Sequence, residues 1–125
     1  MIKTIKIKLL KSFKFEKDFN FIGIIIIYSA IMLLPRDLFV QVPGGDNFGH
    51  IYLDFLLTII IFYIFSNFKF FNKLIIVLGL TTLIEFLQSF TTRNFSYHDL
   101  IYNFLGIYIA IIVFYFFIIS KNKKN

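Results

Sequence analysis

Four apolar runs dominate the pattern of hydrophobic and polar positions along the chain. They cover about residues 19–34, 48–65, 74–90 and 100–119. A membrane-spanning helix needs roughly 20 mainly apolar residues, with about 17 as the lower limit, and the last three runs meet or nearly meet that length. The first run is shorter and follows a basic segment, as in a signal peptide, but it leads into LLPRD without a small-residue cleavage site. The pattern therefore predicts four transmembrane helices.

Composition agrees with a membrane protein and excludes several other classes. The 125 residues are 58% hydrophobic, whereas a soluble domain is typically about 45–50% apolar. The chain has no cysteine, which excludes disulfides, thiol catalysis and thiolate metal sites. The formal charge is +6, but no nucleic-acid-binding signature accompanies it. We therefore expect membrane lipids, and not nucleic acid, as the partners of the basic residues.

The basic residues also predict the orientation. Six lysines lie in residues 1–18, two lie in the 66–73 loop and three lie in the 120–125 tail, whereas each of the two remaining loops has one arginine. Loops rich in Lys and Arg stay in the cytoplasm. We predict an all-α, antiparallel four-helix bundle over residues 19–119 in a cytoplasmic membrane. Both basic terminal segments would be cytoplasmic, and loops 35–47 and 91–99 would lie outside.

Polar side chains recur at helical spacings within three of these helices. They form one stripe on each helix, and the three stripes are Glu85 and Gln88, then Asp99, Asn103, Gly106 and Ala110, then Asp46, His50 and Asp54. With a rise of about 1.5 Å per residue, all three stripes lie at the same shallow depth in the outer half of the membrane. The small members of the second stripe would let a neighbouring helix come close. The pattern predicts a single polar pocket that opens outward.

Each polar residue also has a structural explanation. Asp99, preceded by Ser96, could cap the fourth helix, because both side chains accept hydrogen bonds from free backbone N–H groups. Asn103 and Gln88 could join helices by ordinary hydrogen bonds, worth about 0.6 kcal/mol each. These roles and a binding role do not exclude one another.

The charged residues carry the strongest functional signal. A carboxylate such as Glu85 in a membrane helix costs several kcal/mol unless it is paired or neutralised, and such residues are usually functional. The alternatives are that Glu85 pairs with Arg93 to hold the bundle, and that His50 and Asp46 form an interfacial pair. Asp54 and Glu85 cannot both stay ionised cheaply. One would be protonated, or a positive group would lie between them: Arg93, a divalent cation or a cationic part of a ligand.

The polar series resembles the VanZ-like family of small bacterial membrane proteins. The matching residues are Asp46, His50, Glu85, Gln88, Arg93, Ser96, Asp99, Asn103 and Gly106. The chain departs from the family pattern at Asn47, where a Lys is usual, at Asp54, where an aromatic is usual, and at Ala110, which is often Gly. The family is named for an accessory protein of a glycopeptide-resistance cluster. The resemblance implies an integral membrane protein with a site near the cell-envelope side, and it does not imply resistance.

Two functions follow as expectations. In the first, the pocket binds or modulates an envelope lipid, a lipid-linked cell-wall precursor or a glycopeptide-like antibiotic; the binding residues would be Glu85, Gln88, Arg93, Asp99, Asn103, His50 and Asp46. In the second, the protein is a hydrolase or transferase acting on such a lipid. Glu85 would be its general base, and a divalent metal would be held by Asp46, His50 and Asp99. The first is favoured because no nucleophile motif and no specific metal motif is present. Four helices are too few for a wide pore, so transport would need a homo-oligomer.

Overall fold

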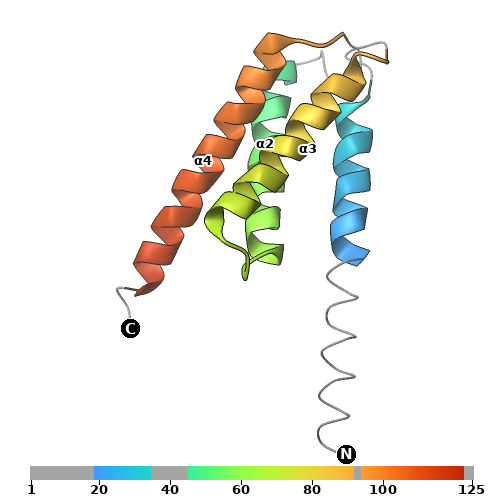
Figure 1. Ribbon diagram of the computed structural model, residues 1–125. Helices are drawn as coiled ribbons and strands as arrows, with labels where there is room; N and C mark the ends of the chain where they lie inside the picture. The colour runs from blue at the N-terminus through green and yellow to red at the C-terminus, as the bar shows by residue number, and fades with distance from the viewer. Residues whose placement is uncertain (1–18, 35–44, 92–93, 123–125) are drawn as a thin grey trace, which may run out of the picture.

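The computed structural model describes residues 19–34, 45–91 and 94–122. Within these ranges the chain forms four α-helices and no strand. They are a helix at Phe19–Met32, α2 at Gly45–Ile64, α3 at Phe70–Gln88 and α4 at Tyr97–Asn122. Figure 1 shows the helices as one bundle, in which α2 and α3 join at one end and α3 leads to α4 at the other. Helices α2, α3 and α4 are long and apolar enough to cross a membrane, whereas the Phe19–Met32 helix is shorter.

The three long helices begin before the apolar runs that predicted them, whereas the first helix ends at Met32 and α3 ends at Gln88, each two residues before its run does. α2 begins at Gly45 instead of residue 48, α3 begins at Phe70 instead of residue 74, and α4 covers Tyr97–Asn122 instead of 100–119. The added turns contain polar residues, such as Asp46 in the first turn of α2. A carboxylate there is favourable because the N-terminus of a helix carries partial positive charge. The apolar runs therefore mark the lipid-compatible part of each helix and not its ends.

The core lies where α2, α3 and α4 pack together. Ile61 of α2, Val77 of α3 and Ala110 of α4 are fully buried, and Leu57 and Ile107 are nearly so. Burying an aliphatic side chain of this size stabilises a soluble fold by about 1.5–3 kcal/mol. In lipid the corresponding gain comes from close packing, because lipid tails are as apolar as leucine.

Gly106 marks the closest approach of α2 and α4. A Cβ atom built on Gly106 would lie 2.3 Å from the backbone oxygen of Ile51 and 3.0 Å from its carbonyl carbon. Real Cβ atoms essentially never come within 3.0 Å of another atom. The predicted role of the small-residue stripe is therefore confirmed at Gly106, since no other side chain allows this backbone contact.

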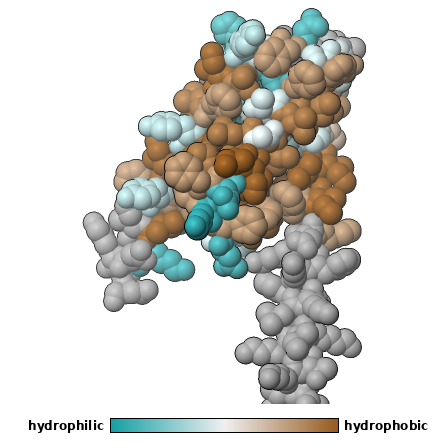
Figure 2. All heavy atoms as spheres, in the orientation of Figure 1, coloured by the Kyte–Doolittle hydropathy of each residue, from teal (hydrophilic) through white to brown (hydrophobic). Residues whose placement is uncertain are grey.

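The outer surface of the bundle is mainly apolar. Figure 2 shows brown, apolar side chains over the middle of one face, with hydrophilic residues towards its two ends. Large hydrophobic residues are strongly exposed on all three long helices, among them Tyr63, Phe71 and Phe116. A soluble monomer rarely exposes so continuous an apolar surface, whereas a membrane protein presents it to lipid.

Candidate functional site

Buried polar side chains lie inside the bundle. In the described part of the chain they are His50, Asp54, Thr58, Lys73, Thr81, Glu85, Gln88, Asp99 and Asn103. Their contacts divide most of them into two groups. The first, which we call the His50 cluster, consists of Asp46, His50, Glu85, Ser96, Asp99 and Asn103.

Asn103 connects the three long helices at the centre of the His50 cluster. Its Oδ1 lies 2.7 Å from Nδ1 of His50 on α2, and its Nδ2 donates to Oε2 of Glu85 on α3 at 3.3 Å. His50 is 2% exposed, and Asn103 and Glu85 are not exposed at all. The predicted convergence of three stripes is therefore observed for these residues, and one amide satisfies a buried imidazole and a buried carboxyl group together.

The orientation of Asn103 determines the roles of the two imidazole nitrogens. An amide oxygen can only accept a hydrogen bond, so Nδ1 of His50 carries the hydrogen and donates it. Nε2 then faces Asp46 Oδ1 and Asp99 Oδ2, each at 3.8 Å. An unprotonated Nε2 places its lone pair towards two carboxylates, which is unfavourable. A cation bound between Nε2 and the two carboxylates would remove this repulsion.

The same three residues have the donor set of a metal site. One oxygen of Asp46, one nitrogen of His50 and one oxygen of Asp99 all lie within 4.8 Å of one another. A metal-binding histidine usually donates its other ring N–H to an oxygen acceptor, which fixes the ring. His50 makes such a contact with Asn103. Two carboxylates and one imidazole suit a borderline or hard divalent cation.

Ser96 completes the cluster at the start of α4. Its hydroxyl oxygen accepts a hydrogen bond from the backbone N–H of Asp99 at 3.3 Å, and its own backbone N–H donates to Oε1 of Glu85 at 3.4 Å. The capping oxygen of α4 therefore belongs to Ser96, while the carboxylate of Asp99 faces His50. Both oxygens of Glu85 accept hydrogen bonds, which lowers the cost of its burial.

Asp54 belongs to a second group and not to the His50 cluster, although the two share a face of α2. Its Oδ1 accepts hydrogen bonds from the hydroxyl of Tyr28 at 3.0 Å and from the hydroxyl of Thr81. Its Oδ2 is buried without a hydrogen-bond partner. We did not single out Tyr28 or Thr81 from the sequence. Thr81 lies one helical turn before Glu85, so the helical phase of α3 could have indicated it.

Gln88 points to another part of the bundle. Its Nε2 donates to the backbone oxygen of Met32 at 2.6 Å, and its Oε1 has no partner. This contact corresponds to the helix-joining role that the sequence left open, because it links α3 to the end of the Phe19–Met32 helix. Arg93 lies outside the described residues, so its predicted pairing with Glu85 stays a prediction.

Comparison with known proteins places the chain in a family. A family model described as VanZ/LLP1 matches residues 3–118, which is most of the chain. No match was found among curated proteins or among solved structures. The matched region includes α2, α3, nearly all of α4 and every residue of the His50 cluster. With three helices that can cross a bilayer, the chain belongs to the VanZ/LLP1 family of membrane proteins.

Proposed function

We propose that the His50 cluster binds the polar headgroup of an amphiphilic envelope molecule and modulates its handling. The class includes envelope lipids, lipid-linked cell-wall precursors and glycopeptide-like antibiotics. The observation that carries the proposal is the buried hydrogen-bonded chain from His50 through Asn103 to Glu85. A membrane bundle of this size does not need such a chain for stability, because polar contacts between membrane helices contribute little on average.

The orientation of the protein decides which leaflet supplies the ligand. The basic terminal segments and the basic 66–73 loop favour a cytoplasmic location for both chain ends. The His50 cluster is formed by the start of α2, the end of α3 and the start of α4. It would then face the outer leaflet of the bacterial cytoplasmic membrane, where envelope precursors and antibiotics meet the bilayer.

The charges of the cluster determine the ligand chemistry. Asp46, Glu85 and Asp99 supply three carboxyl groups around one imidazole. Such a set favours a cationic amine or several sugar hydroxyls, which donate hydrogen bonds to carboxylates. Arg93, in the loop before α4, is the proposed partner for a phosphate or carboxylate of the same ligand. An amine and a phosphate occur together in phosphatidylethanolamine, which makes this lipid a suitable first probe.

A direct test is binding of phosphatidylethanolamine to the purified protein, measured by native mass spectrometry. Glu85→Gln keeps the size of the side chain but removes its charge, and we expect binding to fall at least severalfold. Asp54→Asn is the matched control, because it makes the same chemical change in the second polar group and leaves Oδ1 able to accept its two hydrogen bonds. Equal loss in both variants, or no loss in Glu85→Gln, would contradict the proposed site.

The convergence of Asp46, His50 and Asp99 favours a second candidate, a metal-dependent hydrolase or transferase acting on an envelope lipid. The metal would activate water, and Glu85 would act as general base. Metal analysis of the purified protein tests this function. One equivalent of a divalent metal, lost in His50→Ala but retained in His98→Ala, would favour the enzyme function over the binding function. If cells with the Glu85→Gln variant kept the full phenotype of the unchanged protein, the enzyme function would be excluded, since an amide cannot take a proton from water.

A further inference from the structure

A cavity lies at the end of the bundle opposite the His50 cluster. It has a volume of about 630 Å³ and lies between the start of α3 and the second half of α4, with Phe62 of α2 at its side. Its walls are almost entirely apolar, and of the described residues that line it only Lys73 is charged. Lys73 is twelve residues before Glu85 on α3, about 18 Å away along the helix. The cavity is therefore a separate feature from the cluster.

Lys73 is unusual for a lysine at the end of a membrane helix. From the sequence we expected it in the 66–73 loop, but it lies in the first turns of α3 and is only 8% exposed. Its Nζ is 4.9 Å from the ring centre of Phe62 and 5.8 Å from that of Phe114. Aromatic faces attract an ammonium group but accept none of its three hydrogen bonds in the way an oxygen does. Within the described residues no carboxylate pairs with Lys73, and all four described acids belong to the two polar groups above.

The end of α3 adds to the positive potential around Lys73. The first backbone N–H groups of a helix have no partner within the helix and carry partial positive charge. The residue before α3 is Lys69, and it provides no side-chain hydrogen bond to cap these groups. Lys121, in the last turn of α4, adds another cation to the same end of the bundle. The cavity thus combines apolar walls with a buried cation at a positively charged helix end.

We propose that this cavity binds an anionic glycerophospholipid of the inner leaflet, with its phosphate at Lys73 and an acyl chain along α4. The volume is within the roughly 300–1,000 Å³ of typical small-molecule sites. An anionic lipid is favoured over a zwitterionic one because the described lining offers a cation at Lys73 and no acidic side chain to bind a headgroup amine. The predicted orientation places this end of the bundle at the cytoplasmic face, where anionic headgroups meet basic residues.

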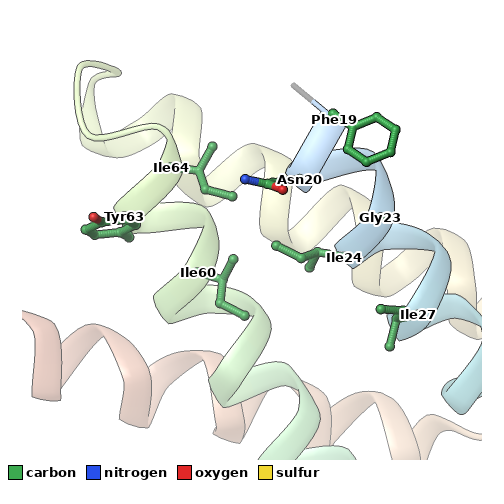
Figure 3. Close-up of a pocket in the computed structure, with 8 residues that line it drawn as sticks. All are labelled: Phe19, Asn20, Gly23, Ile24, Ile27, Ile60, Tyr63 and Ile64. Atoms are coloured by element: carbon green, nitrogen blue, oxygen red, sulfur yellow. The ribbon is translucent and has the colours of Figure 1, made fainter. Parts of the chain in front are cut away.

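Another cavity shows why the lysine matters. It has a volume of about 470 Å³ and lies between the Phe19–Met32 helix and α2. Figure 3 shows Ile24 and Ile27 on one side and Ile60 and Ile64 on the other, with Asn20 at the edge. Among the described residues that line this cavity none is ionic, so they provide no group that would select a headgroup. Of these two cavities, the one at Lys73 has a described side chain that distinguishes one lipid class from another.

Lipid quenching of a tryptophan placed in the cavity tests the proposal. The chain has no tryptophan, so Tyr115→Trp, at an exposed position that lines the cavity, gives a single signal. In vesicles of phosphatidylcholine, we expect dibrominated phosphatidylglycerol to quench this tryptophan more strongly than dibrominated phosphatidylcholine. In the same background, Lys73→Met should reduce the preference about fivefold, from the roughly 1 kcal/mol that one lysine contributes near an anionic surface. Lys73→Arg should retain it.

Two controls decide whether the cavity itself is responsible. Lys69→Met removes the same charge from an exposed position four residues earlier and should reduce the preference much less than Lys73→Met does. A loss as large as that of Lys73→Met would indicate general surface charge and overturn the proposal. Ile112→Phe should fill the cavity and weaken quenching, whereas Ile109→Phe, on the same helix but outside the lining, should not. Relief of quenching by inorganic phosphate at millimolar concentration would mean that free phosphate is the ligand, and this too would overturn the lipid site.

Discussion

Gly106 offers the sharpest test of how packing supports the polar cluster. In Gly106→Ala, the new methyl group would lie 2.3 Å from the backbone oxygen of Ile51, whereas an ordinary contact begins at 3.4 Å. The contact partner is backbone, so it cannot rotate away. Helices α2 and α4 must therefore separate by about 1 Å at this level, or tilt relative to each other.

The separation should affect both stability and the site. Forcing an extra methyl group into a packed interior usually costs about 1–3 kcal/mol. Ile51 follows His50 directly, and Gly106 is one turn after Asn103. An added 1 Å would lengthen the 2.7 Å contact between His50 Nδ1 and Asn103 Oδ1 to about 3.7 Å, which no longer counts as a hydrogen bond. We therefore expect Gly106→Ala to lower the free energy of unfolding and to weaken ligand binding together.

Gly79→Ala is the matched control for Gly106→Ala. A Cβ atom at Gly79 meets nothing within 4 Å, so the same substitution only replaces a poor helix former by a good one, a gain of up to about 1 kcal/mol. The assay is equilibrium unfolding in mixed micelles with increasing dodecyl sulfate, followed by the near-ultraviolet circular dichroism of the aromatic residues. The difference between the two variants isolates the overpacking. If Gly106→Ala is as stable as Gly79→Ala, the inferred backbone contact between α2 and α4 is refuted.

Three further substitutions probe the buried polar groups by the same unfolding measurement. Asn103→Ala leaves both His50 and the carboxyl group of Glu85 with one hydrogen bond fewer and should cost about 1–2 kcal/mol; a cost below 0.5 kcal/mol would contradict the role of the amide. Tyr28→Phe removes one donor to Asp54 and should cost about 1–2 kcal/mol, with the loss confined to stability and ligand binding unchanged. Gln88→Leu removes one hydrogen bond and also a buried oxygen without a partner, so we expect a change within about 1 kcal/mol, and a larger loss would indicate that Gln88 has a partner beyond Met32.

The sequence was sufficient to predict the long helices and the centre of the polar cluster. Apolar runs identify α2, α3 and α4 because lipid leaves few alternatives to a helix. Helical phase and depth together predicted that His50, Glu85 and Asn103 would meet, since polar residues at the same depth on facing helix surfaces come within contact distance. Three points stay predictions: whether the first helix spans the membrane, which side of the membrane each end of the bundle faces, and the contribution of Arg93 to the polar cluster.

The sequence was less informative where a side chain chooses between neighbours. Glu85 and Gln88 share a face of α3, yet one points to Asn103 and the other to the backbone of Met32. Spacing gives the face of a helix but not the rotation of that helix against its neighbours, which packing decides. Lys73 was misplaced for a related reason. A loop rich in basic residues predicts the cytoplasmic side, but it does not reveal that a long lysine stem can lie along apolar surface.

The contact at Gly106 also limits how the bundle can change shape. Where two backbones touch, no side chain is left to rearrange, so α2 and α4 form a rigid frame that carries Asp46, His50, Asp99 and Asn103. Glu85 is carried by α3, which meets this frame near the cluster through hydrogen bonds that can be exchanged. Under the proposed function, a ligand that enters the cluster would displace α3 and not this frame, and we expect the movement to pass along the helix to Lys73 at its other end.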